Sequence, residues 1–348
     1  MTETSACRMA HARVAFDWAF TAFGMTVRSE LPVQGSLRND PLGRASDVSI
    51  TQASTEELRE AWIDAAATCL LERSLPDGTL GMRVECRDGY GYRVHAPGHG
   101  EFFISVDGSL VRCAPADGPS WRWQRPFFAQ VLPIAATLKG FELLHASAVV
   151  LNGAAVAFSG RSGAGKTSLA VHLASRGAYL LTDDVLSLKC RAGTVMAQPG
   201  VPMVNVASEQ LESMSPTARD RLGTTVGTSD KVHIQPGCMP KASFPLTALY
   251  FVERGADVSH VTFESLDPPD PLRLLGATFL PHLLTTRKLV YQLETCAEIA
   301  SSVRIYRLRA PKEVPAASLA EAVEHHAGSA GTSRRPLGVL RSRAAVIR

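Results

Sequence analysis

The sequence predicts an α/β domain built around a phosphate loop, preceded by a module of mixed helices and strands. Two observations lead to this fold class. An apolar segment, a glycine-rich loop and a helix-forming segment follow one another between residues 154 and 176. Residues 13–120 instead alternate short strand-like segments with turns that contain glycine. The 348 residues allow two or three domains, so both parts can bury a core of their own.

Composition excludes several other classes of protein. Apolar residues make up 45% of the chain and charged residues 20%, which excludes a disordered or fibrous protein. The formal net charge of +3 offers no general attraction for nucleic acid, so we expect no such partner. The seven cysteines include no C-x-x-C pair. They predict free thiols in a cytoplasmic protein rather than a disulfide framework or a zinc site.

Two apolar stretches resemble membrane signals without being typical of them. Residues 14–27 are interrupted by Asp17 and alternate in a strand-like manner. Residues 141–160 contain Glu142 and the pair Asn152-Gly153, a strong signal for a hairpin turn. We therefore expect two strands there, over 146–150 and 154–159, and no contact with a membrane.

Patterning divides the chain into four segments. Residues 56–73 predict a helix with one apolar face, whereas 82–94 and 101–113 predict strands. Residues 121–140 predict a helical connector that Pro126 starts and Pro133 bends. The arginines after residue 328 are typical of a solvated tail. The expected segments are a flexible N-terminus (1–12), an N-terminal α+β module (13–125), a phosphate-loop catalytic domain (126–327) and a basic flexible tail (328–348).

The glycine-rich loop carries the most specific signal. Residues 160–167 match G-x-x-x-x-G-K-[ST] in full, between a predicted strand and a predicted helix over 166–176. Glycines let backbone N–H groups surround phosphate oxygens, and the helix N-terminus adds partial positive charge. Lys166 would reach the β- and γ-phosphates, and the Thr167 hydroxyl would ligate Mg²⁺. The predicted nucleotide site comprises Gly160, Arg161, Ser162, Gly163, Ala164, Gly165, Lys166, Thr167 and Ser168.

Two adjacent acidic residues, Asp183 and Asp184, follow the next predicted strand, over 178–181. In doubly wound sheets ligands bind at the carboxyl ends of strands, so these carboxylates should face the phosphates. One carboxylate that holds Mg²⁺ and one that takes a proton would suffice for phosphoryl transfer. Adjacent aspartates also occur as ordinary turn residues. Because the chain contains neither N-K-x-D nor L-S-G-G-Q, a kinase is favoured over a GTPase or an ABC ATPase.

Residues 143–189 resemble the catalytic core of HPr kinase/phosphorylase and its kinase-like relatives. That family shares its phosphate-loop arrangement with ATP-dependent phosphoenolpyruvate carboxykinases. Its pattern is a histidine that opens a hairpin, then G-x-S-G-x-G-K-[ST], R-G and D-D. The matching residues are His145, 160–167, Arg176-Gly177 and Asp183-Asp184, with weaker similarity over 198–202 and 246–254. The N-terminal part resembles the leading part of relatives associated with peptide natural-product maturation, including lasso-peptide kinases.

The resemblance implies ATP- and Mg²⁺-dependent transfer of the γ-phosphate to a hydroxyl, in a serine of a protein or peptide. Asp183 would be the general base, and Asp184 would ligate Mg²⁺ beside Thr167. His145 would lie close to the transferred phosphate, and Lys231 would make a second phosphate contact or remain an ordinary surface lysine. The family's hexamers suggest a homo-oligomer.

One departure from the family limits these expectations. The signature E-[IV]-R-G-x-G is replaced by AQPGVPMVNV, which lacks glutamate and arginine. A third metal-site carboxylate, a phosphorylase reaction and HPr as the substrate are therefore not implied. Two other functions remain open: a kinase for the hydroxyl of a small metabolite such as free serine or a sugar, and a non-catalytic ATP-binding regulator.

Overall fold

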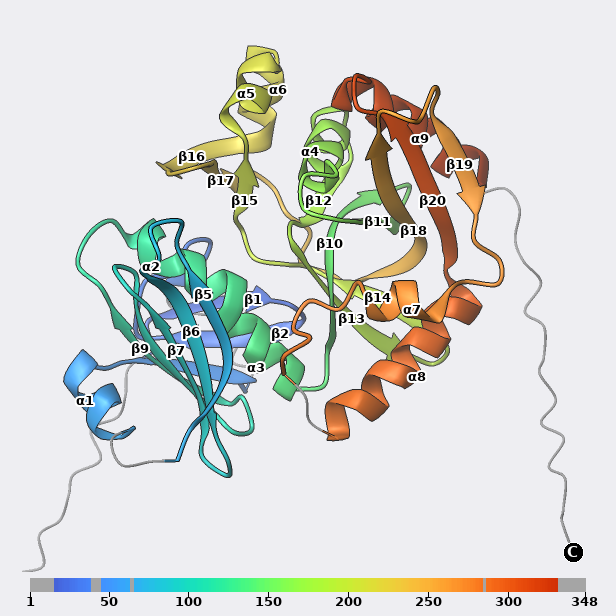
Figure 1. The fold of residues 1–348 in the computed structure, drawn as a ribbon. Helices are drawn as coiled ribbons and strands as arrows, with labels where there is room; N and C mark the ends of the chain where they lie inside the picture. The colour runs from blue at the N-terminus through green and yellow to red at the C-terminus, as the bar shows by residue number, and fades with distance from the viewer. Residues whose placement is uncertain (1–15, 39–44, 63–65, 284–285, 331–348) are drawn as a thin grey trace, which may run out of the picture.

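The computed structural model describes residues 16–38, 45–62, 66–283 and 286–330. The chain forms a nine-stranded sheet, an eight-stranded sheet and a small three-stranded sheet, whose strands are inserted within the sequence of the second (Figure 1). Among the described residues, no helix has the length and apolar character needed to cross a membrane. Residues 1–12 lie outside the described chain, as do all residues of the expected tail after 330. Residues 328–330 end the last helix.

The first sheet has the strand order β3-β1-β2-β4-β9-β8-β7-β6-β5. Neighbouring strands are antiparallel except at β4, which runs parallel to both β2 and β9. The strand-like alternation predicted for residues 82–94 and 101–113 is confirmed. The strands are β1 (Trp18–Ala22), β2 (Met25–Ser29), β3 (Leu37–Arg38), β4 (Val48–Gln52), β5 (Thr68–Ser74), β6 (Leu80–Arg87), β7 (Gly91–Ala96), β8 (Gly100–Ser105) and β9 (Leu110–Pro115).

The single helix predicted over residues 56–73 is wrong. The helix α1 (Thr55–Glu60) is short, and a capping box between Ser54 and Glu57 fixes its start. Residues 68–74 form β5 instead, antiparallel to β6. A register irregularity between Cys69 and Leu71 lets the consecutive residues Leu70 and Leu71 both pack partly against the core. Apolar spacing alone does not distinguish this arrangement from a helix face.

The helical connector packs on the nine-stranded sheet. It comprises α2 (Ser120–Pro126), a π-helical turn η1 (Phe127–Val131) and α3 (Leu132–Leu138). Phe127, Leu132 and Ile134 are fully buried in the same core as Phe102 and Ile104 of β8. Pro126 lies in the last turn of α2 rather than at its start, which differs from the expectation. The backbone N–H of Leu132, directly before Pro133, donates to the carbonyl oxygen of Phe127, five residues earlier in the chain.

The second sheet is mixed rather than uniformly parallel. Only β11, β18 and β20 run parallel, and the long strands β10 and β18 pair with different neighbours along their length. Its order is β11-β10-β13-β14-β18-β20-β19, and β12 pairs with β10. The strands are β10 (Glu142–Leu151), β11 (Ala154–Ser159), β12 (Tyr179–Thr182), β13 (Val185–Arg191), β14 (Thr194–Gln198), β18 (Phe244–Gly255), β19 (Thr262–Ser265) and β20 (Arg304–Pro311).

Helices cover both faces of this sheet. Because side chains alternate along a strand, neighbouring residues of β11 pack against helices on opposite faces. Val156 and Phe158 of β11 pack on the side of α4 (Lys166–Ser175) and α9 (Ala316–Ala330). Ala155 and Ala157 pack on the other side, with α7 (Pro271–Leu275) and α8 (Thr286–Ser302).

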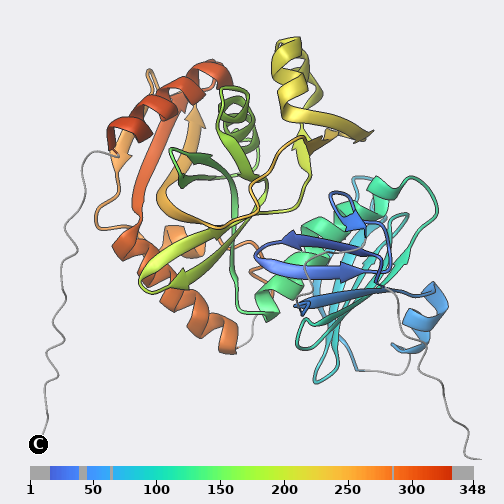
Figure 2. The ribbon, with the colours of Figure 1, turned by 180° about the vertical axis from the view of Figure 1, so that it is seen from behind.

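The third sheet is inserted between β14 and β18, in the order β15-β17-β16. It comprises β15 (Val204–Val206), β16 (Gly223–Thr228) and β17 (Val232–Pro236). The helices α5 (Ser208–Ser213) and α6 (Pro216–Leu222) precede β16. Seen from both sides, the hairpin formed by β16 and β17 stands between α4 and the end of the N-terminal module that carries α2 (Figures 1 and 2).

Candidate functional site

The predicted strand, loop and helix are confirmed by β11, residues 160–165 and α4. Gly165, at the N-cap of α4, has a φ of 91°, a left-handed conformation that favours glycine. Gly160 has a φ of 148°, and a Cβ at this position would lie 2.6 Å from the carbonyl oxygen of Val252. The loop therefore passes close to β18 only because glycine occupies position 160.

Lys166 folds into the mouth of this loop. Its side chain is largely buried, and Nζ donates to the carbonyl oxygens of Gly160 at 2.9 Å and Arg161 at 3.3 Å. Burial lowers the pKa of Lys166, whereas the negative charges of Asp184 and Asp183 act in the opposite direction. A cation is thus held where the motif predicts a contact with phosphate.

Asp183 lies buried at the turn between β12 and β13, where its carboxylate accepts three hydrogen bonds. Its Oδ1 accepts from the hydroxyls of Thr167 and Ser147, both at 2.8 Å, and its Oδ2 accepts from the backbone N–H of Asn205 at 3.2 Å. Burial raises the pKa of Asp183 to about 6, and repulsion from Asp184 acts in the same direction. Thr167 therefore hydrogen-bonds to Asp183, whereas the resemblance implies that Asp184 ligates Mg²⁺ beside Thr167.

Asp184 is half-buried and has a φ of 61°. Its carboxylate makes no hydrogen bond or ion pair with another described residue, although its charge acts on both Lys166 and His145. The two adjacent carboxylates thus differ: that of Asp183 is saturated with donors, and that of Asp184 is free to meet a ligand.

His145 lies beside Asp184, on β10. The Nδ1 atom of its ring lies 3.2 Å from the carbonyl oxygen of Asp184, so this nitrogen carries the proton and Nε2 keeps a lone pair. Burial lowers the pKa of His145, and the charge of Lys166 lowers it further. The ring lies 6.0 Å from that of Phe279, and the backbone N–H bonds to the carbonyl oxygen of Ala277 at 2.6 Å. Residues 277–279 thus pack against the histidine and hold its backbone.

A buried carboxyl supports the same segment. Glu142 is 1% exposed, and Gln292 of α8 donates to it at 3.3 Å. Gln292 also donates to Thr278, and Lys288 of the same helix donates to the carbonyl oxygen of Leu280. Burial raises the pKa of Glu142 from 4.5 to about 7, and the charge of Lys288 acts in the opposite direction.

Glu142→Gln is expected to flatten the dependence of stability on pH. Because the folded state holds the proton of Glu142 more tightly, its contribution to stability is complete below pH 4.5 and is lost as the pH rises through about 7. Between pH 5 and pH 8 the variant should lose less stability than the wild type, by about 1–3 kcal/mol. Urea unfolding at several pH values measures this difference. Parallel profiles for the two proteins would contradict the assignment.

Lys231 lies in the turn between β16 and β17 and is half-buried. It makes no hydrogen bond or ion pair with a side chain of another described residue. Its charge lowers the pKa of Lys166, so the two lysines lie within electrostatic range of each other. An anion bound between these two lysines would favour the charged form of both.

Ser168 does not join this group. Its hydroxyl donates to Gln210 of α5 at 2.7 Å, which ties α4 to the inserted segment. Ser147 and Asn205, by contrast, were not predicted from the sequence and contact Asp183 directly. Neither residue lies in a recognisable motif, because Ser147 comes from β10 and Asn205 from β15, far apart in the sequence.

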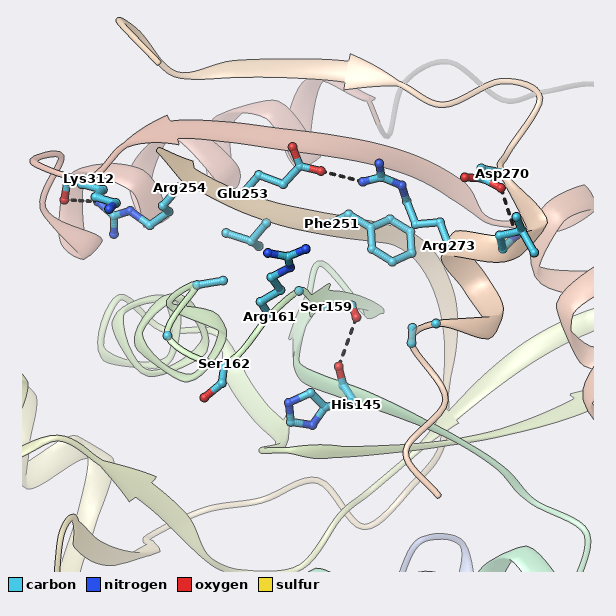
Figure 3. A pocket seen from close by; sticks show the side chains of 17 residues that line it. His145, Ser159, Arg161, Ser162, Phe251, Glu253, Arg254, Asp270, Arg273 and Lys312 are labelled. Atoms are coloured by element: carbon cyan, nitrogen blue, oxygen red, sulfur yellow. Dashed lines mark hydrogen bonds and ion pairs between the residues drawn. The ribbon is translucent and has the colours of Figure 1, made fainter. Parts of the chain in front are cut away.

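A cleft of about 1220 Å³ opens beside the loop (Figure 3). Residues 159–164 and His145 form one side, facing the end of β18 with Phe251 and Glu253, and α7 with Arg273. Arg254 donates to carbonyl oxygens of residues 311, 312 and 314, which fixes the loop after β20 at the rim. Thr167, Asp183, Asp184 and Lys231 lie outside the lining of this cleft. Lys166 also lies outside the lining, so the cleft opens along the loop and ends at His145, whose ring contacts the backbone of Asp184.

Neither a family model nor a curated protein sequence matches the chain. Among solved structures, the chain is similar to the Hpr(Ser) kinase/phosphatase from Coxiella burnetii. The alignment has 16% sequence identity and a TM-score of 0.31, and it covers 55% of this chain and 99% of that one.

Proposed function

We propose that this protein is an ATP- and Mg²⁺-dependent kinase that transfers the γ-phosphate to a hydroxyl of a protein or peptide, such as that of a serine. The proposal depends chiefly on the difference between the two adjacent carboxylates. Asp183 is fixed against the Thr167 hydroxyl, whereas the carboxylate of Asp184 is free and lies close to Lys166 and His145. Phosphoryl transfer needs both kinds of group, one that supports the metal ion and one that accepts a proton.

The oxygen atoms available suit Mg²⁺, which prefers one or two carboxylates together with water and phosphate oxygens. Thr167 and Asp183 would hold the ion, with Asp184 within reach of it. The described residues contain no group of three or more His, Cys, Asp or Glu side chains arranged to hold a metal on their own. This matches an ion that shares its ligands with a nucleotide. When bound, Mg²⁺ would neutralise charge on the phosphates.

The chain's own residues would perform the remaining steps. Backbone N–H groups of residues 160–165 and the N-terminus of α4 would bind the phosphates, with Lys166 on the transferring group. Asp184 would take the proton from the attacking hydroxyl. His145, whose Nε2 carries a lone pair, would orient that hydroxyl or share its proton. This reverses the roles of Asp183 and Asp184 that the family resemblance implies.

The cleft beside the loop supports a protein or peptide acceptor only in that the N-terminal module does not cover it. A metabolite kinase would be expected to close its acceptor site with the N-terminal module. The residues that line the cleft lie between 145 and 312, so no described residue of residues 16–125 closes it. An open cleft can admit an extended chain.

The test is to follow labelled phosphate. The purified protein is incubated with Mg²⁺, γ-labelled ATP and a fractionated extract of the source cells, beside a Lys166→Ala control. Label that appears on a peptide or protein hydroxyl with the wild type only would support the proposal. Label on a small molecule would favour a metabolite kinase. Intact nucleotide binding without any transfer would favour a regulator.

A further inference from the structure

The N-terminal module contacts the hairpin that carries Lys231. Arg125 of α2 donates through Nη1 to the Ser229 hydroxyl at 3.0 Å, and its Nη2 lies 3.3 Å from Oδ1 of Asp230. Both partners lie in the turn between β16 and β17, directly before Lys231. Because Asp230 is 70% exposed, the ion pair adds little stability, and its effect is to orient the turn.

Trp121 makes the apolar part of the same contact. Its ring lies 5.1 Å from the ring of His233 on β17, measured between centroids. On the neighbouring strand, a Cβ at Gly227 would lie only 2.5 Å from the indole. Glycine at this position thus lets the indole lie directly against the hairpin.

His233 continues the contact towards the acidic pair. The side chain is fully buried, with Nε2 3.0 Å from the Ser229 hydroxyl and Nδ1 2.6 Å from Oδ1 of Asn205. The backbone N–H of Asn205 donates in turn to Asp183. Burial lowers the pKa of His233 to about 4, so the ring is neutral at pH 7 and these bonds persist. An unbroken series of contacts therefore joins α2 to Asp183.

We propose that Trp121 and Arg125 are positioning residues, through which the N-terminal module holds the β16–β17 hairpin so that Lys231 and Asn205 face the phosphate site. This inference rests on the proposed kinase function. Neither residue touches the loop or the acidic pair. They act through the hairpin, and phosphate transfer should depend on them although nucleotide binding by the loop should not.

The first measurement does not depend on activity. In Trp121→Ala and Arg125→Ala, hydrogen exchange over residues 223–236 should become faster, while exchange over α4 stays unchanged. Gly227→Ala, which crowds the same contact from the other side, should act like Trp121→Ala. Arg83→Ala is the matched control, because it removes an exposed ion pair to Glu72 elsewhere in the module. Unchanged exchange over 223–236 in both α2 variants would overturn the proposal.

The second measurement separates positioning from general loss of structure. Transfer by the α2 variants should fall by about 10- to 100-fold in kcat, with an unchanged dissociation constant for MgADP. The charge-reversed pair Arg125→Asp with Asp230→Arg should recover activity that either single variant loses. Equal loss of transfer and MgADP binding, without recovery in the pair, would mean a structural role only.

The two proposals can fail separately. If the wild type transfers no phosphate but the exchange effect is present, the kinase function fails and the positioning stands. If the wild type transfers phosphate and the α2 variants do so at the same rate, the positioning fails and the kinase function stands. Should Trp121→Ala not fold, Trp121→Phe and the Arg125 variants decide the outcome.

Discussion

Lys166→Ala is expected to lower phosphate transfer by about 1000-fold and to weaken nucleotide binding by about 10- to 100-fold. The ammonium group is held inside the phosphate loop by two carbonyl oxygens, so its charge lies beside the backbone N–H groups that would bind the phosphate. Its side chain is only 6% exposed, and charge interactions strengthen where water is excluded. Transfer should fall more than binding, because negative charge on the phosphoryl oxygens is spread differently in the transition state.

Steady-state transfer and calorimetric nucleotide binding measure the two effects. Lys189→Ala is the matched control, since this exposed lysine lies over the ring of Phe141, away from the loop. Thermal unfolding of both variants checks that the fold is intact. If Lys166→Ala transferred phosphate within a few-fold of the wild-type rate, the loop would not be the catalytic phosphate site.

The loop and its helix could be predicted from the sequence because their determinants are local. Gly160, Gly165 and Lys166 act through backbone conformation and a helix N-terminus that lie within one short segment. The hairpin before the loop was predictable for the same reason, since Asn152-Gly153 dictates its turn. Residues 143–160 needed no information from distant parts of the chain.

The difference in hydrogen bonding between Asp183 and Asp184 was not predictable in this way. Adjacent residues at a strand end point in different directions. Which of the two aspartates is buried depends on which direction leads into the protein. Ser147 and Asn205, from β10 and the start of the inserted segment, supply the donors that fix Asp183. Together with Thr167, these donors come from three places in the sequence, so no sequence spacing predicts them.

The contact between α2 and the β16–β17 hairpin also could not be predicted from the sequence. Trp121 and Arg125 lie more than 100 residues from Ser229 and His233, and no motif links these positions. The apolar residues of the helical connector share a core with the nine-stranded sheet, and this core also includes Val185 of β13. Long-range packing of this kind depends on residues that are far apart in the sequence, so local patterning does not reveal it.

Asp184→Asn is expected to lower transfer by about 100- to 10,000-fold while MgATP binding stays within a few-fold of the wild type. The carboxylate of Asp184 makes no hydrogen bond with another described residue, so its amide replacement disturbs no contact that the fold needs. What the variant loses is the ability to accept a proton from the attacking hydroxyl, since an amide oxygen is a far weaker base. The left-handed conformation at this position, with a φ of 61°, is one that asparagine tolerates well.

Asp183→Asn should behave differently, which makes the two variants controls for each other. Removing its charge weakens the oxygen cluster around Thr167, and its new amide group faces either two hydroxyls or the N–H of Asn205. Mg²⁺-dependent nucleotide binding should therefore fall together with transfer, while binding of metal-free ATP changes little. Calorimetry with and without Mg²⁺, alongside transfer rates, distinguishes the pair. If Asp183→Asn instead bound MgATP normally without transferring phosphate, and Asp184→Asn lost the metal dependence, Asp183 would be the base and Asp184 the Mg²⁺ ligand.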